Sequence, residues 1–224
     1  LLDWKKNTDG CKALLIEGAR RIGKSTIAEE FGRNEYKSYI LIDFNMASEV
    51  VRNAFRDYLN DLDTFFMIIS SEYGVKLHRR ESLIIFDEIQ KFPKAREAVK
   101  YLVADGRYDY IETGSLISIR ENVEGITIPS EERPINMYPL DFEEFAWAMG
   151  EEQMIDYIRK CFSDRKPMEQ SLHAKAMLLF RQYMIVGGMP QSLSAYIGND
   201  RDFAKADMEK RDILTLYRKD IMRI

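Results

Sequence analysis

The chain has 224 residues, a hydrophobic fraction of 46%, and 33 basic against 37 acidic residues, which gives a net charge of -4. The hydrophobic fraction excludes a disordered chain, and the charge balance removes the global basic signature of nucleic-acid-binding proteins. No apolar run approaches the roughly 20 residues that a membrane-spanning helix needs, so we expect no membrane partner.

Apolar runs of strand length alternate with helix-like stretches through the first 140 residues. This alternation predicts βαβ units and a parallel sheet, and the middle strands are apolar throughout, which fits burial on both faces. The expected strands are 13–17, 38–44, 82–88, 108–114 and 134–140, and the expected helices are 24–32, about 47–72, 94–105 and 115–122.

The strand pattern stops after Leu140. Asp141 is a plausible N-cap for the first of several helices, and "VGGMP" at 186–190 breaks their run, because a proline cannot continue a helix. We therefore expect an α/β core over 1–140 and a mostly helical module, lid-like or winged-helix-like, over 141–224. The helices expected in this module are 141–162, about 169–186, 190–197 and 202–222.

The stretch "GARRIGKST" follows the first expected strand and opens the first expected helix. Its spelling, G-x-x-x-x-G-K-[ST], is that of a phosphate-binding loop, in which glycines let the backbone N–H groups approach a polyphosphate. Lys24 would reach the β- and γ-phosphates, and the Ser25 hydroxyl would bind Mg²⁺. The alternative is a chance match, but the strand before and the helix after favour a nucleotide site. The predicted nucleotide-binding residues are Gly18, Ala19, Arg20, Arg21, Ile22, Gly23, Lys24, Ser25 and Thr26.

Two further strand ends carry polar side chains. "LIIFDEIQ" ends in Asp87 and Glu88; an acid at the carboxyl end of a parallel strand can help to hold Mg²⁺, and Glu88 could activate the attacking water. "IETGS" places Thr113 where it would sense the γ-phosphate, if its strand lies beside that of Asp87. The alternative for Asp87 and Glu88 is a solvated acidic turn that ends the strand. The alternative for Thr113 is an ordinary turn, because Thr, Gly and Ser are turn residues.

Five stretches in this order, "GARRIGKST", "LIIFDEIQ", "ETGS", "YPLDFEEF" and "VGGMP", resemble a family of prokaryotic AAA+-type ATPases that usually carry a C-terminal DUF4143 domain. The resemblance runs from about residue 10 to 222 and implies a RecA/AAA+-like P-loop NTPase fold. It implies that Lys24 and Ser25 belong to a Walker A motif, that Asp87 and Glu88 form a Walker B pair, and that Thr113 is sensor 1.

The same resemblance implies two more roles. Arg133 falls just before the expected fifth strand, similar to an arginine finger that completes a neighbour's site in a homo-oligomer. Arg120 is the rival, because the family often has Gly-Arg where this sequence has Glu132-Arg133. Pro190, in the Gly-Gly-x-Pro stretch, resembles the lid motif that covers the adenine, whereas a plain helix cap is the alternative.

The function expected from these residues is Mg²⁺-dependent hydrolysis of ATP to ADP and phosphate, coupled to movement of core against lid. A P-loop kinase and a nucleotide-dependent binding or signalling module with little turnover are the alternatives. Glu88 beside Asp87 favours water as the phosphate acceptor. A protein or nucleic-acid partner stays open, because the basic runs near residue 107 and at the end of the chain are too short to predict a groove.

Cys11 and Cys161 are the only cysteines, and two isolated cysteines are typical of reduced thiols in a cytoplasmic protein. They combine with neither His78 nor His173 at a metal-ligand spacing, so the expected metal is nucleotide-bound Mg²⁺. The first residue is Leu rather than Met, from which we expect a piece of a longer protein that lacks the DUF4143 domain.

Overall fold

A computed structural model describes residues 1–115 and 129–222. The chain forms two compact units, Leu1–Ala19 with Gly23–Met137, and Arg20–Ile22 with Tyr138–Ile224. Among the described helices, none combines the length and the apolar composition that crossing a bilayer requires.

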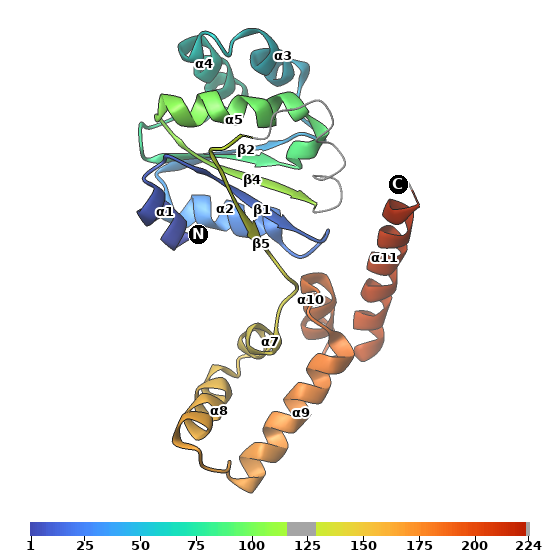
Figure 1. Cartoon of the computed structure of the whole chain (residues 1–224). Helices are drawn as coiled ribbons and strands as arrows, with labels where there is room; N and C mark the ends of the chain where they lie inside the picture. The colour runs from blue at the N-terminus through green and yellow to red at the C-terminus, as the bar shows by residue number, and fades with distance from the viewer. Residues whose placement is uncertain (116–128, 223–224) are drawn as a thin grey trace. The chain divides into compact units, whose positions relative to one another are not determined.

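The first unit is built on a parallel sheet (Figure 1). All its strand pairs are parallel, and the order is β2-β3-β4-β1-β5, so β4 lies between β1 and β3. This confirms the predicted five-stranded parallel sheet of a P-loop NTPase fold. The strands are β1 (Ala13–Gly18), β2 (Ser38–Asp43), β3 (Ser82–Asp87), β4 (Asp109–Ser115) and β5 (Glu132–Asn136).

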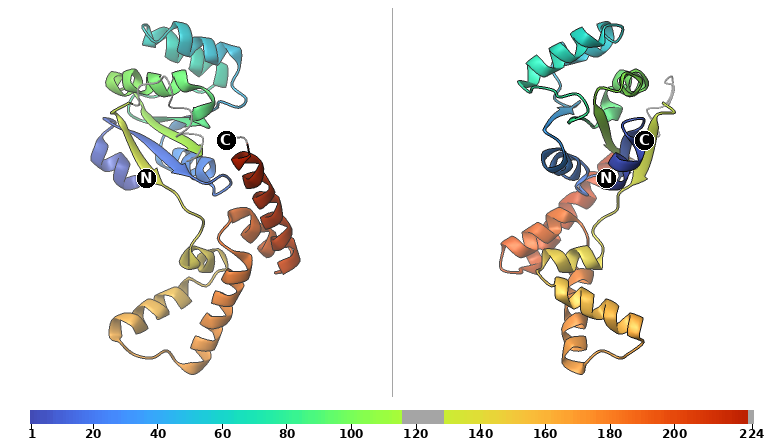
Figure 2. Two further views of the ribbon diagram at one scale, coloured as in Figure 1. Left: turned by 45° about the vertical axis from the view of Figure 1, so that its right-hand side comes forward. Right: turned by 90° about the vertical axis from the view of Figure 1, so that its left-hand side faces the viewer.

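Helices cover both faces of this sheet. Both views of Figure 2 show the sheet between α2 (Lys24–Glu35) and α5 (Pro93–Asp105). Successive strand residues point to opposite faces, so Leu14 packs with α2 while Leu15 packs with α5. The two-sided burial explains the continuous apolar runs in the sequence. α1 (Leu2–Thr8) packs on the α2 face, and α3 (Glu49–Asp57) and α4 (Leu62–Tyr73) pack on the α5 face.

Two expected elements of the first unit differ in the structure. The long helix expected over 47–72 is two helices, because the Asp61 side chain accepts the Thr64 N–H at 3.1 Å and starts α4. The fifth strand covers 132–136 rather than 134–140 and pairs with β1 at the edge of the described sheet. As an edge strand it tolerates Pro134, which has no N–H to donate. The helix expected over 115–122 lies outside the described residues, apart from Ser115, which ends β4.

The described residues of the second unit from 138 to 222 form helices joined by turns and loops and contain no strand, so that segment has no β-hairpin wing. The helix expected over 141–162 is two helices, because Gly150, at φ 75°, interrupts it. Asp141 and Glu144 form a capping box at the start of the first one, as the sequence suggested for Asp141. The helices are α7 (Phe142–Ala148), α8 (Glu152–Asp164), α9 (Gln170–Val186), α10 (Pro190–Gly198) and α11 (Phe203–Ile221). Their shared core contains Phe145, Ala146, Ile155, Leu179, Val186, Leu193, Tyr196 and Ala206.

Candidate functional site

The predicted phosphate-binding loop connects the end of β1 to the start of α2. Gly23 precedes the helix at φ 96°, a conformation that side chains disfavour. Lys24 is only 6% exposed, and its Nζ donates to the backbone oxygens of Gly18 and Ala19 at 3.1 and 2.7 Å. The lysine therefore lies across the loop, where its charge is available to an anion bound by the loop backbone.

The middle of the loop, Arg20–Ile22, is grouped with the second unit. Inside that unit, Arg21 Nη1 donates to Gln191 Oε1 at 3.0 Å, and the Tyr217 hydroxyl donates to the Arg20 carbonyl at 2.7 Å. Thr26 follows Ser25 in the first turn of α2. The part that these residues play in nucleotide binding stays a prediction.

Three separate elements meet at Asp87, the last residue of β3. The Ser25 hydroxyl donates to Asp87 Oδ1 at 2.7 Å, and the buried Thr113 hydroxyl of β4 donates to the same oxygen. The insertion of β4 between β1 and β3 allows this meeting. A carboxylate beside a hydroxyl fits Mg²⁺, which is commonly held by one or two carboxylates together with substrate phosphates. Among the described residues, no group of three or more His, Cys, Asp or Glu forms a fuller metal site.

Glu88 directly follows Asp87 and has an unusual backbone conformation for a residue other than glycine, with φ 54° and ψ 45°. Its N–H lies 3.4 Å from Thr113 Oγ1, and its Oε2 accepts from Gln90 Nε2 at 2.5 Å. Sequence reasoning missed Gln90. The available signal was a glutamine two residues after Glu88, inside the short turn Ile89–Lys91 that follows β3.

The structure does not bring Arg133 together with Asp87. Arg133 is the second residue of β5 rather than a residue before that strand, so its expected position was wrong, and its role as an arginine finger stays a prediction. It pairs with Leu14 near the start of β1, whereas the phosphate loop begins at the other end of β1. Its side chain is 47% exposed and lies 4.0 Å from Asp3. Arg120 lies outside the described residues.

The "VGGMP" corner lies in the second unit. Gly187 ends α9 at φ 79°, and a Cβ on Gly188 would lie 2.0 Å from the Leu140 oxygen. Pro190 is the first residue of α10, where a missing N–H costs little. These observations account for the glycines and the proline as a helix corner, and the adenine contact stays a prediction.

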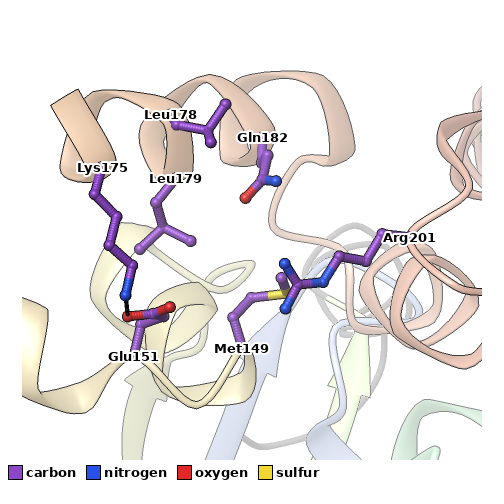
Figure 3. Close-up of a pocket in the computed structure, with 7 residues that line it drawn as sticks. All are labelled: Met149, Glu151, Lys175, Leu178, Leu179, Gln182 and Arg201. Carbon is purple, nitrogen blue, oxygen red and sulfur yellow. Dashed lines mark hydrogen bonds and ion pairs between the residues drawn. The ribbon is translucent and has the colours of Figure 1, made fainter.

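A pocket in the second unit is lined by seven residues (Figure 3), none of which is a predicted nucleotide-binding residue. Lys175 donates to Glu151 at 2.6 Å at one side of it. The pocket therefore has no part in the predicted nucleotide site. The lining residues are Met149, Glu151, Lys175, Leu178, Leu179, Gln182 and Arg201.

A buried carboxyl group adjoins Thr113 along β4. Glu112 is 0% exposed, and within the described part of the chain neither of its carboxyl oxygens has a hydrogen-bond partner. The neighbouring Glu132 forms a two-bond ion pair with Arg96 of α5, at 2.8 and 2.7 Å. Burial, and then the charge of Glu132, raise the pKa of Glu112 well above its ordinary value.

A family model described as an AAA domain matches residues 11–146, which include the phosphate loop, Asp87, Glu88, Thr113 and Arg133. No curated protein matches the chain. Among solved structures, C. elegans PCH-2 matches with a TM-score of 0.41 and 8% identity, over 96% of this chain and 62% of that chain. The chain thus spans less than two thirds of PCH-2, and a likeness this low has no bearing on function. Since the family model covers more than half of the 224 residues, the chain belongs to the AAA domain family.

Proposed function

We propose that this AAA domain binds ATP with Mg²⁺ and hydrolyses it to ADP and phosphate. The supporting observation is the meeting at Asp87 of a hydroxyl from the phosphate loop and a hydroxyl from β4. A strand that ends in a solvated acidic turn would need neither contact. The arrangement joins the three stretches that sequence reasoning assigned to one nucleotide site.

Each residue of the site has a defined part in this proposal. The loop backbone and the Lys24 ammonium bind the β- and γ-phosphates, helped by the positive end of the α2 dipole. Ser25 and Asp87 hold Mg²⁺, which when bound offsets the negative charge of the phosphates. Thr113 fixes Asp87 by hydrogen bonding and lies beside the Glu88 amide.

Glu88 is the general base of the proposed reaction. Its carboxylate accepts a proton from water as the water oxygen forms a bond to the γ-phosphorus. The bond between that phosphorus and the bridging oxygen breaks, and ADP leaves with the electron pair. A carboxylate next to the Mg²⁺ ligand favours water over a second substrate as acceptor, which distinguishes this reaction from that of a kinase.

The remaining parts of the proposal concern coupling and assembly. The first unit is the ATPase core, and the second is a helical lid whose Pro190 packs on the adenine and which moves with nucleotide state. Arg133, exposed on an edge strand, acts on the site of a neighbouring copy in a homo-oligomer. These parts rest on the resemblance to AAA+-type ATPases with a DUF4143 domain.

The test is release of inorganic phosphate from Mg²⁺-ATP with no acceptor added. Glu88→Gln should keep ATP bound but lower turnover by about 10²- to 10⁴-fold, the usual loss with a general base. Lys24→Ala should weaken ATP binding or abolish turnover in a folded protein. Lys100→Ala, at an exposed lysine of α5 in the same unit, is the matched control. Phosphate transfer that requires an added acceptor would contradict hydrolysis, and so would wild-type turnover in both site variants.

A further inference from the structure

Gln90 is a buried amide whose side chain contacts the proposed general base. It is 7% exposed, and its Nε2 donates to Glu88 Oε2 at 2.5 Å. Within the described part of the chain, its other polar atom, Oε1, is buried without a hydrogen-bond partner. Burying an amide costs free energy that a hydrogen bond only partly offsets. An apolar side chain would fill this position at a lower free-energy cost of burial. The polar side chain therefore points to a function for its contact with Glu88.

The local backbone holds Gln90 firmly. It lies in the short 3-10 turn Ile89–Lys91, where the Lys91 and Phe92 N–H groups donate to the carbonyls of Glu88 and Ile89 at 2.9 and 3.0 Å. Ile89 is fully buried in the core on the α5 face. The hydrogen-bonded turn and the buried Ile89 therefore fix the position of the Gln90 amide.

The Glu88 carboxylate needs a hydrogen-bond donor that holds it in place. Its carboxylate ends a flexible side chain, and its backbone adopts the left-handed conformation at φ 54°. A general base must be held within hydrogen-bond reach of the water that it deprotonates, and a displacement of about 1 Å can cost about 10²-fold in rate. Gln90 supplies a neutral donor, so it orients the carboxylate without protonating it.

We infer that Gln90 is a positioning residue, which holds the Glu88 carboxylate in the direction required for attack by water. The inference rests on the proposed function, since it assigns Gln90 a part only through Glu88. Gln90 touches neither nucleotide nor water in this account. Its loss should therefore lower kcat and leave ATP affinity unchanged.

The decisive experiment is a double-mutant cycle of Gln90→Met and Glu88→Gln in the full chain, measured as phosphate release and as ATP affinity. Gln90→Met keeps an unbranched side chain of similar length but removes both polar atoms. We expect kcat to fall by about 10- to 100-fold, with KM and ATP affinity within about 2-fold of the wild type. The double variant should be no slower than Glu88→Gln alone, because residues that act as a unit are not additive.

Two further variants are measured beside the double-mutant cycle, one at Gln90 and one as a control. Gln90→Glu has nearly the same shape but places a second carboxylate against Glu88, and it should be at least as slow as Gln90→Met. Ser82→Ala, which removes a buried hydrogen-bonding hydroxyl at the opposite end of β3, controls for general loosening of the strand and should keep its kcat.

The outcomes separate the two claims. A slow Glu88→Gln with wild-type kcat in both Gln90 variants overturns the inference and leaves the proposed function standing. Losses that multiply in the double variant, or an equal fall in ATP affinity, show a merely structural role and also overturn it. A Glu88→Gln protein with wild-type turnover overturns the general-base role and the inference together.

Discussion

Replacing the buried, ionisable carboxyl group of Glu112 with an amide should stabilise the first unit at neutral pH. Glu112 faces Glu132 of β5 and Arg96 of α5, and Glu17 of β1 also acts on Arg96. Arg96 makes two hydrogen bonds to Glu132, and among the described residues no donor bonds either carboxyl oxygen of Glu112. The folded protein therefore holds Glu112 in its neutral form up to a higher pH than the unfolded chain does.

The sign and size of the effect follow from this raised pKa. The stability that Glu112 contributes is complete below its unfolded value of 4.5 and is lost as pH rises through the folded pKa. Across that window the folded state binds one proton more than the unfolded state. The free energy of unfolding should then fall by up to about 1.4 kcal/mol per pH unit from this group. Glu112→Gln keeps the shape, cannot ionise, and should remove that slope.

The assay is urea unfolding from pH 5 to pH 8, followed by tryptophan fluorescence. The chain has two tryptophans, and only Trp4 lies in the first unit, 3% exposed and packed against Phe31. A Trp147→Phe background therefore makes the signal specific for the unit that contains Glu112. Glu81→Gln, at an exposed carboxyl of the same unit, controls for the loss of one negative charge.

The wild-type and Glu112→Gln curves should diverge with rising pH, and Glu81→Gln should run parallel to the wild type. Parallel curves for the wild type and Glu112→Gln across pH 5–8 would refute the reasoning. Glu112 would then have the same proton affinity in the folded and the unfolded chain, despite its burial.

Three other predictions concern the proposed site. Asp87→Asn should weaken Mg²⁺-dependent ATP binding, seen as a rightward shift of the Mg²⁺ titration of phosphate release; an unchanged titration would exclude Asp87 as a metal ligand. Inactive Arg133→Ala mixed with inactive Lys24→Ala should partly recover ATPase activity, and a fully active monomer whose specific activity is independent of concentration would rule out a finger in trans. Pro190→Ala should lower ADP affinity in calorimetry with little change in the melting temperature of the nucleotide-free protein; equal affinity would leave Pro190 as an ordinary helix start.

Local sequence patterns predicted much of the candidate nucleotide site. The loop spelling at 18–26 and the acidic pair at the end of an apolar strand could be read directly, because phosphate and metal binding demand particular residue types at short, fixed spacings. The alternation of apolar runs and helical stripes likewise predicted the parallel sheet, since burial on both faces imposes that composition. The sequence predicted that Thr113 lies near the γ-phosphate only on the condition that its strand lies beside that of Asp87. The structure meets this condition, and the contact with the phosphate stays a prediction.

Strand order and side-chain partners were decided by the tertiary structure alone. Packing of residues far apart in the chain inserts β4 between β1 and β3, and this brings Ser25 and Thr113 to one oxygen of Asp87. The same packing buries Glu112 in β4, and nothing in the local sequence of that strand predicts this burial. No local rule predicts the contact of Gln90 with Glu88, because it depends on a left-handed residue and the turn that follows it. The sequence by itself determined which chemical groups stand at the end of each strand. The tertiary structure decided which of those groups come into contact, because only the packing of the whole core holds distant parts of the chain together.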